Sequence, residues 1–242
     1  MTRVVVTGMG VVSPIGNSID TFWHNLVAGV SGVGPVTQFD ATGLPVRIAA
    51  EVKDFDPSTA MDHHTARRSS RFVQFSVAAS RQAIDDAGLN LADEDPYRVG
   101  VVINTGGGGM GDISAGTEQL LKRGPDKVSP LLIPSLIPNM GSCQVSITFG
   151  IKGPVITSIL ACASGIHALV AARRMILDGD ADVVLAGGAE SCLMPLAFAG
   201  LSRMGALSKR NDDPEHASRP FDADRDGFVF GEGPGVLVLE RE

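Results

Sequence analysis

Leu160-Ala161-Cys162-Ala163-Ser164-Gly165 is the stretch from which the architecture of this chain can be worked out. It follows a β-branched run over residues 155–159, which predicts a buried strand. It precedes apolar residues that recur at helical spacing from Ile166 to Leu177, where Asp178-Gly179 ends the pattern. A single cysteine is therefore predicted at the point where a strand gives way to a helix.

That position suits Cys162 as a nucleophile. Unpaired backbone N–H groups and the positive end of the helix dipole favour a thiolate at a helix N-terminus. The same N–H groups stabilise an oxyanion on an acyl group bound to the sulfur. A lone cysteine is more often a small core residue, however, and a cysteine nucleophile needs acid–base partners that this sequence does not obviously offer. On residue type alone, both roles for Cys162 stay open.

The α/β alternation continues along the whole chain. Strands are predicted at residues 3–7, 98–104, 155–159, 182–188 and 235–240, and helices at 17–29, 65–87, 134–150 and 166–177. A tight glycine loop is expected at residues 8–16, an irregular insertion at 30–57, and a loop-rich segment with a short helix at 189–217. Strands that alternate with helices predict a mainly parallel sheet covered on both faces, in the α/β class.

Composition and charge limit the classes of function. The 242 residues are 44% hydrophobic with 29 glycines, which suggests α/β layers built from small residues. A net charge of −7 argues against general nucleic-acid binding. No apolar run reaches the roughly 18 residues of a membrane-spanning helix, and no signal peptide is recognisable. Three cysteines without a framework spacing fit a reducing compartment, so we expect a cytoplasmic protein.

The other cysteines and the histidines are expected to be structural. His167 follows Cys162 by five residues, so on one helix their side chains would point about 140° apart and would not form a dyad. None of the five histidines has a metal-ligand spacing with a cysteine. Cys143 and Cys192 are expected to be small buried residues.

Two further clusters have alternative explanations. Gly106–Gly109 lacks the Gly-Lys-Ser/Thr of a phosphate-binding P-loop, so we expect it to allow close backbone approach to a ligand or a packed helix. Arg67, Arg68 and Arg71 lie in the first turns of the helix predicted over 65–87. They form either a solvated face or a docking site for an acidic partner.

Ordered motifs extend from one end of the chain to the other. They are the run from Val4 to Pro14, Ala161-Cys162-Ala163-Ser164-Gly165, Gly187-Gly188-Ala189-Glu190, Ala206-Leu207-Ser208, Arg219-Pro220-Phe221-Asp222, Arg225-Asp226-Gly227-Phe228-Val229 and Gly231-Glu232-Gly233. In this order they resemble the β-ketoacyl-acyl-carrier-protein synthases, particularly the elongating type II enzymes of bacterial fatty-acid synthesis and their polyketide relatives. So many motifs together make the resemblance specific.

The resemblance implies a thiolase-like fold: two similar α/β halves in five layers, αβαβα, of which residues 1–242 correspond to the N-terminal β-ketoacyl synthase domain. Cys162 would accept an acyl group from acyl carrier protein, and its backbone N–H would be one of two oxyanion-hole donors. Malonyl-carrier protein would then lose CO2, and its carbanion would attack the thioester in a Claisen condensation. No metal or organic cofactor is implied.

The same resemblance places the two catalytic histidines, a supporting lysine and the second oxyanion-hole N–H in a C-terminal half that is absent after Glu242. The helix from Cys162 is also apolar around most of its surface, which is typical of a buried layer. We therefore expect a fragment or one part of a split enzyme, inactive by itself. It would form a homodimer or assemble with a C-terminal half, without binding a membrane or nucleic acid.

Further residues carry weaker implications. Arg67 and Arg68 match basic positions that dock the acidic carrier protein in relatives. Gly107 falls where elongating relatives often have a bulky aliphatic residue in the acyl pocket, which predicts a roomier pocket here. One alternative is a non-catalytic subunit that shapes a chain-length pocket, although such subunits typically lack the nucleophile. Another is thiolase-type chemistry on coenzyme A thioesters, which the motifs from Arg219 to Gly233 disfavour.

Overall fold

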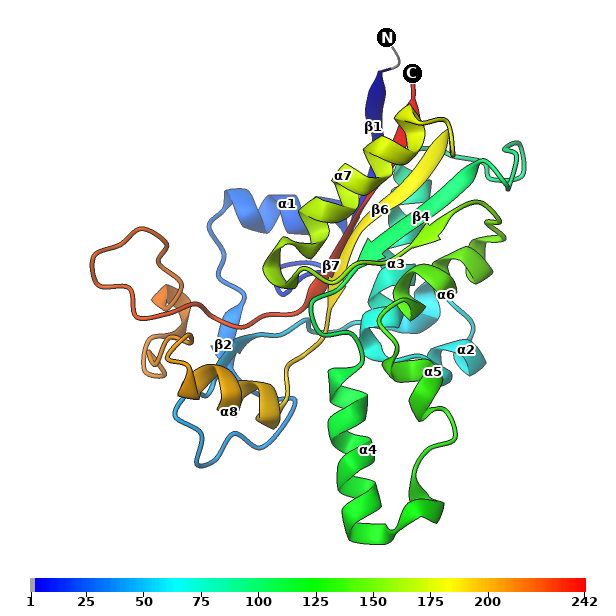
Figure 1. The fold of residues 1–242 in the computed structure, drawn as a ribbon. Helices are drawn as coiled ribbons and strands as arrows, with labels where there is room; N and C mark the ends of the chain where they lie inside the picture. Colours follow the sequence, from blue (N-terminus) through cyan, green and yellow to red (C-terminus); the bar gives the residue numbers. More distant parts are fainter. Residues whose placement is uncertain (1–2) are drawn as a thin grey trace.

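A computed structural model describes residues 3–242, whose central sheet has the strand order β1-β7-β6-β4-β5 (Figure 1). The strands are β1 Val4–Val11, β4 Val99–Asn104, β5 Val155–Ile156, β6 Val183–Glu190 and β7 Gly233–Arg241. β4 pairs in parallel with β5 and β6, whereas β7 runs antiparallel to both of its neighbours, β1 and β6. Every strand of this sheet except β7 shares one direction, so the prediction of a mainly parallel sheet is confirmed.

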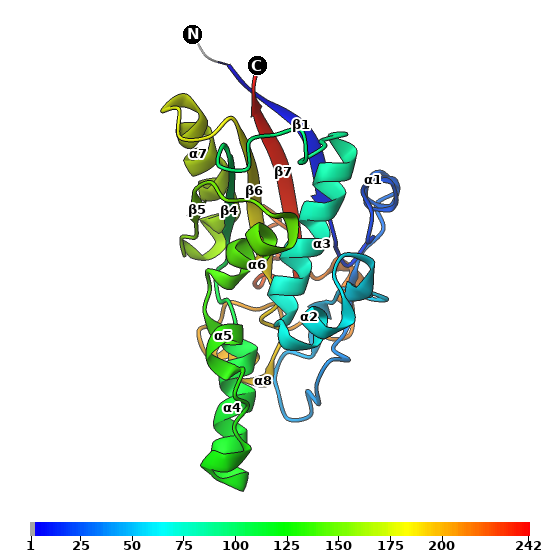
Figure 2. The ribbon, with the colours of Figure 1, turned by 90° about the vertical axis from the view of Figure 1, so that its right-hand side faces the viewer.

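Helices cover both faces of the sheet, as Figure 2 shows edge-on. The three that lie on it are α3 Arg71–Asp86, α6 Met140–Phe149 and α7 Ser164–Leu177. α3 and α6 share one face, where Phe75 of α3 and Val238 of β7 are fully buried in the same core. α7 lies on the opposite face, where Ala172 is fully buried with Val184 of β6. Burial of such apolar side chains contributes about 1.5–3 kcal/mol for each large one, and it fixes the layers.

The outer side of α7 is uncovered in residues 3–242. Ile166 and Val170 expose 70% and 44% of their surface, and Ile159 and Leu160 in the preceding segment are also exposed. The apolar pattern predicts a buried layer for this helix, but within the described chain only its sheet-facing side is buried. A strip of exposed apolar side chains marks an interaction surface.

A second, smaller core lies beside one end of the sheet (Figure 1). It combines a two-stranded antiparallel sheet, β2 Val33–Pro35 and β3 Ile48–Ala50, with helix α8 Pro195–Arg203. Phe198 of α8 is fully buried there and its ring meets that of Phe39 edge-on at 5.2 Å. The insertion predicted to be irregular therefore contains a strand pair, while the short helix predicted in the later loop-rich segment is confirmed.

The remaining helices are shorter or lie at the edges of the sheet. They are α1 Ile19–Val27, α2 His63–Arg68, α4 Met110–Arg123 and α5 Leu132–Leu136, with 3₁₀ turns η1 Pro57–Thr59, η2 Pro125–Lys127, η3 Ala161–Ala163 and η4 Pro214–His216. α4 was not predicted, because Gly111 and Gly116 lower its helix propensity. Gly116 serves packing instead: a Cβ there would stand 3.0 Å from the Leu132 side chain of α5. α4 projects away from the sheet (Figure 1).

Two predicted helices are each broken into two. The helix predicted over 65–87 becomes α2 and α3, because Ser69 and Ser70 both take extended backbone conformations and end one helix before the next begins. The helix predicted over 134–150 becomes α5 and α6, because Ile137 precedes Pro138 and its backbone is extended, with ψ 125°. A residue before proline is disfavoured in the helical region.

The glycine loop predicted over residues 8–16 is wrong at its beginning, because Gly8 and Gly10 belong to β1. A Cβ on Gly10 would stand 1.9 Å from the carbonyl oxygen of Ala79, and one on Gly8 would stand 2.2 Å from that of Ala83. The two glycines therefore let β1 lie directly against the backbone of α3. The sequence pattern alone does not distinguish this use of glycine from a turn.

Gly10→Ala is expected to lower the free energy of unfolding by about 1–3 kcal/mol, the usual cost of overpacking. The cost arises because the added methyl meets backbone, which cannot rotate away. Urea midpoints measure it. Gly235→Ala is the matched control, because a Cβ there on β7 meets nothing within 4 Å. Equal midpoints for the two variants would contradict the close approach of β1 and α3.

Candidate active site

Cys162 is exposed in the η3 turn directly before α7, so its predicted place at a helix N-terminus is confirmed. β5 is shorter than predicted and ends at Ile156, and residues 157–160 lead from it to the turn. Both residues of β5 are exposed in the described chain, so the prediction of a buried strand is wrong there. Ala161 has a φ of 48°, in the left-handed region that side chains other than glycine rarely adopt. Such a conformation costs about 1–2 kcal/mol and persists only where the surroundings hold it.

Asn104, at the end of β4, holds this turn from beneath. Its side chain is fully buried. The Nδ2 amide donates to the carbonyl oxygen of Ser164 at 3.0 Å, and the Oδ1 oxygen accepts the N–H of Ser158 at 2.7 Å. One carboxamide therefore joins the sheet, the segment after β5 and the N-terminus of α7. Each such bond contributes about 1 kcal/mol, so the pair is comparable to the strain at Ala161.

Ser164 closes the turn from the other side. Its Oγ accepts the N–H of Leu160 at 3.0 Å and donates to the carbonyl oxygen of Thr105 at 3.1 Å. Asn104 and Ser164 were not singled out from the sequence. A polar residue that ends an apolar strand beside a glycine run is the signal that points to Asn104.

The backbone N–H of Cys162 is not used by the hydrogen bonds of the turn. The hydrogen bonds of η3 run from the Ala163 N–H to the carbonyl oxygen of Leu160 and from the Ser164 N–H to that of Ala161. These bonds do not use the N–H of Cys162. An N–H of this kind beside the sulfur has the chemistry of an oxyanion-hole donor.

The glycine run after β4 lies beside the same turn, held by Glu190 at the end of β6. Glu190 Oε2 accepts the N–H groups of Gly106 and Gly107 at 3.1 and 3.0 Å. A Cβ on Gly106 would stand 2.8 Å from Glu190 Oε2 and 3.5 Å from the carbonyl oxygen of Ala161. A Cβ on Gly109 would stand 2.3 Å from Cα of Leu136 in α5. The predicted close backbone approach is confirmed, and a packed helix and a carboxylate make it.

The three cysteines occupy different environments. Cys192 is buried as predicted, with 3% of its surface exposed, whereas Cys143 is half-buried and Cys162 exposed. The Cys192 thiol donates to Glu190 Oε1 at 2.9 Å. Burial raises the pKa of the Cys192 thiol, and the adjacent Glu190 carboxylate raises it further. Cys192 is therefore a neutral thiol, unsuited to nucleophilic attack.

The histidine nearest in sequence does not pair with the nucleophile. His167 lies on α7, and its Nδ1 is buried with no hydrogen-bond partner in the described chain. Its expected structural role stays a prediction. Within residues 3–242, no group of three or more histidine, cysteine, aspartate or glutamate side chains is arranged to hold a metal ion. None of the helices described there is long and apolar enough to cross a membrane.

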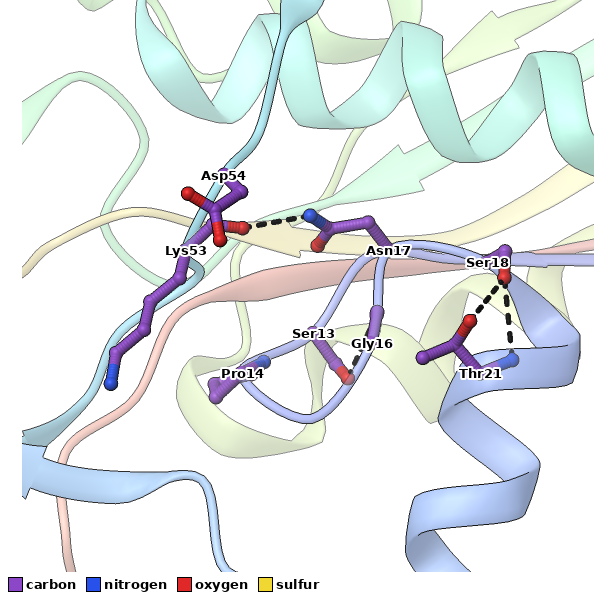
Figure 3. Close-up of a pocket in the computed structure, with 8 residues that line it drawn as sticks. All are labelled: Ser13, Pro14, Gly16, Asn17, Ser18, Thr21, Lys53 and Asp54. Carbon is purple, nitrogen blue, oxygen red and sulfur yellow. Dashed lines mark hydrogen bonds between the residues drawn. The ribbon is translucent and has the colours of Figure 1, made fainter.

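A pocket of about 430 Å³ opens between the end of β1 and the start of α1 (Figure 3). Asn17 Nδ2 donates to the carbonyl oxygen of Lys53 at 2.7 Å across it, and Ser18 caps α1 by accepting the N–H of Thr21. The lining holds neither a cysteine nor a histidine. The pocket therefore has neither a thiol nor an imidazole to activate a hydroxyl, and Cys162 remains the centre of the candidate site.

The arginine cluster is divided by the fold. Arg67 and Arg68 are exposed at the end of α2. Arg71 instead turns inward and forms a bidentate ion pair with the buried Glu232. Of the three, only Arg67 and Arg68 are exposed, and Arg68 Nη1 lies 3.3 Å from Nε2 of His64 on the same helix.

Comparison with known proteins decides the family. The profile described as "Beta-ketoacyl synthase, N-terminal domain" matches residues 1–242. The chain belongs to this family. Relatives of this β-ketoacyl synthase domain include the 3-oxoacyl-acyl-carrier-protein synthase 2 of Coxiella burnetii, 49% identical over 239 residues, and that of Vibrio harveyi, 48% identical. Each match covers 99% of this chain and 58% of the relative, so the chain spans little more than half the relatives' length.

Solved structures confirm the predicted fold class, the N-terminal half of a condensing enzyme. The ishigamide ketosynthase/chain length factor matches this β-ketoacyl synthase domain with a TM-score of 0.91 and 36% identity, over 99% of this chain and 58% of that one. A β-ketoacyl synthase from Burkholderia phymatum matches with a TM-score of 0.89 and 34% identity, over 100% of this chain and 60% of that one. A solved complex of a type II polyketide acyl-carrier protein with its ketosynthase contains a chain that matches with a TM-score of 0.83 and 33% identity. That match covers 99% of this chain and 58% of the other.

Asn104→Ala is expected to loosen the turn that carries Cys162 in this β-ketoacyl synthase domain. Loss of two hydrogen bonds should speed amide exchange in residues 157–165 by about tenfold or more, as hydrogen–deuterium exchange mass spectrometry measures. Asn211→Ala is the matched control, because Asn211 likewise accepts the Arg47 N–H and donates to the Pro45 carbonyl oxygen. Unchanged exchange over 157–165 in the Asn104 variant would refute the role of this side chain.

Proposed function

We propose that this chain is the acyl-accepting half of a β-ketoacyl-acyl-carrier-protein synthase, an acyltransferase of fatty-acid or polyketide synthesis. The observation that carries the proposal is the exposed Cys162, held on a strained turn at the N-terminus of α7 with its own N–H free of the turn's hydrogen bonds. The names of the bacterial relatives support the substrate class, an acyl group on a carrier protein.

The first chemical step follows from this geometry. The Cys162 thiolate attacks the carbonyl carbon of an acyl thioester, and the oxygen becomes an oxyanion that accepts a hydrogen bond from the Cys162 N–H. The tetrahedral intermediate collapses, its C–S bond to the carrier breaks, and the carrier leaves as a thiolate, which takes back from solvent the proton that the Cys162 thiol had released. The acyl group is then a thioester on Cys162.

The second step is the condensation. Malonyl-carrier protein loses CO2, and the resulting carbanion attacks the Cys162 thioester to form the new C–C bond and release the sulfur. A histidine pair is expected to assist this step from outside residues 1–242. Leu160, Ile166 and Val170 form an exposed apolar strip beside the cysteine, and we assign this strip to the assembly that completes the site, a second copy or a C-terminal half.

One alternative function has a specific observation in its favour. A similar solved structure is described as a ketosynthase together with a chain length factor. A chain of the second kind would shape the pocket without carrying the acyl group. The exposed Cys162 favours the catalytic role, and the experiment below separates the two.

The test is transfer of an acyl group from octanoyl-carrier protein to the chain, followed by intact mass and peptide mapping. We expect one octanoyl adduct, at Cys162, and its loss in Cys162→Ala. Cys143→Ala is the matched control and should keep the adduct. Absence of any adduct, both for the chain alone and with a C-terminal half supplied, would favour the non-catalytic role.

Arg67 and Arg68 are proposed to dock the carrier protein. Both are exposed on α2, and Arg68 borders a pocket of about 300 Å³ with apolar walls that include Leu131, Met140 and Ile147. Cationic side chains around an apolar hollow suit a partner with an acidic, partly apolar face.

Reversal of both charges, Arg67→Glu with Arg68→Glu, is expected to weaken binding of acyl carrier protein by about tenfold or more at low salt and to flatten its salt dependence. Titration by surface plasmon resonance at two salt concentrations measures both. Arg123→Glu with Lys127→Glu is the control, since it makes the same change in net charge at exposed positions on α4 and the turn after it. Equal weakening by the two double variants would show a general charge effect and refute the docking site.

A further inference from the structure

The ladder of hydrogen bonds between β4 and β5 stops where the chain leaves the sheet for the nucleophile. Val101 donates its N–H to the carbonyl oxygen of Pro154 at 2.9 Å. The bonds of a parallel pair are evenly spaced along the strands, so the next one would join the Ile103 N–H to the Ile156 carbonyl oxygen. The Ile103 N–H instead donates to Ser142 Oγ, at 2.9 Å.

A side-chain hydroxyl therefore stands in the place of a ladder bond. Ser142 is fully buried in the first turn of α6, on the face of the sheet opposite α7 (Figure 2). Its Oγ also lies 3.1 Å from the carbonyl oxygen of Ile156 and 2.9 Å from that of Ile103. A hydroxyl has one hydrogen and two lone pairs, so it can accept from one strand and donate to the other. β5 is thereby held apart from β4 beyond Ile156.

Thr157 continues the same replacement one residue later. Its Oγ1 lies 2.7 Å from Ser142 Oγ and donates to the carbonyl oxygen of Ile103 at 3.1 Å. In a continued ladder that oxygen would accept the N–H of Ser158, which here donates to Asn104 Oδ1 at 2.7 Å. Side chains thus replace the ladder at each step, and the chain leaves β4 for the N-terminus of α7.

We propose that Ser142 is a positioning residue for the acylation of Cys162, because its hydroxyl and that of Thr157 end the β4–β5 ladder and so direct residues 157–160 toward the turn. The inference rests on the proposed acyl transfer to Cys162. Ser142 acts through these four residues of backbone, because the partners of its hydroxyl belong to β4, β5 and Thr157. A misplacement of about 1 Å can cost about a hundredfold in rate. Loss of the hydroxyl should therefore slow the transfer.

The contact between the two hydroxyls is tested by a double-mutant cycle in thermal unfolding. Ser142→Ala and Thr157→Val each remove one hydroxyl of the 2.7 Å pair, and valine keeps the shape of threonine. The double variant should lose less melting temperature than the sum of the two single losses, by about 2 °C or more. Ser146→Ala with Thr148→Val is the control cycle, which should be additive because those two hydroxyls have separate partners. Additivity of the 142 and 157 changes would overturn the proposal.

The positioning role is tested by the kinetics of octanoyl transfer from carrier protein to Cys162. Ser142→Ala and Thr157→Val should each lower the maximal rate by about tenfold or more. The half-saturating concentration of octanoyl-carrier protein should stay unchanged, because the proposed docking residues Arg67 and Arg68 lie on α2 and are not altered. A merely structural change would lower the melting temperature without this split between rate and binding.

Two further variants separate the hydroxyl from the bulk of the side chain. Thr157→Ser keeps the hydroxyl and removes only a methyl group, so it should retain most of the rate. Ser146→Ala, on the same helix as Ser142, should react as fast as the unmodified chain. Equal rates for Thr157→Ser and Thr157→Val would overturn the role of the hydroxyl, and so would an equal loss in Ser146→Ala and Ser142→Ala.

Failure of the proposed function and failure of this inference give different results. If octanoyl-carrier protein does not acylate Cys162, either in the chain alone or with a C-terminal half supplied, both fail. If Cys162 is acylated equally fast in Ser142→Ala and in the unmodified chain, the acyl transfer stands. Ser142 is then only a packing residue of α6.

Discussion

The buried carboxamide of Asn104 is the contact on which the candidate site depends. It ties the end of β4 to the segment after β5 and to the first turn of α7, which lie 54 and 60 residues further along the chain. Without it the left-handed Ala161 would relax, because an isolated alanine does not hold that conformation. The exposed sulfur of Cys162 is therefore oriented from below by the sheet.

Close packing against the backbone is the second constraint, and glycine residues make it possible both in the layers and beside the candidate site. Gly10 lets β1 lie against α3, which brings that helix onto the sheet. Gly107 lets Cys192 enter beneath the loop beside the nucleophile. In both places a methyl group would collide with a neighbouring atom, the Ala79 carbonyl oxygen at Gly10 and the Cys192 sulfur at Gly107. The packing of the layers and that of the site therefore both require a residue without a side chain. Glycines of this glycine-rich chain are thus structural elements of the candidate active site as well as of the layers.

The pairing of certain polar side chains separates structural from functional residues. Arg71 is committed to Glu232, which leaves Arg67 and Arg68 for a partner. Cys192 is committed to Glu190, which leaves Cys162 as the exposed thiol. α7 shows the same division: its inner side is buried on the sheet, and its outer side presents apolar residues to a partner surface.

Periodicity and local motifs were enough to predict the α/β class, the sheet of mainly parallel strands and the place of Cys162 before a helix, because these depend on residues near one another in sequence. Contacts between distant segments decided most of the rest. They put Gly8 and Gly10 into a strand and turned Arg71 inward. The breaks of two predicted helices are local instead: one lies at Ser70, the N-cap of α3, and the other lies before Pro138. Contacts between distant segments also brought Asn104, Glu190 and Cys192 to the site, since a side chain's neighbours across a sheet depend on register and layer packing. No local pattern encodes those distances.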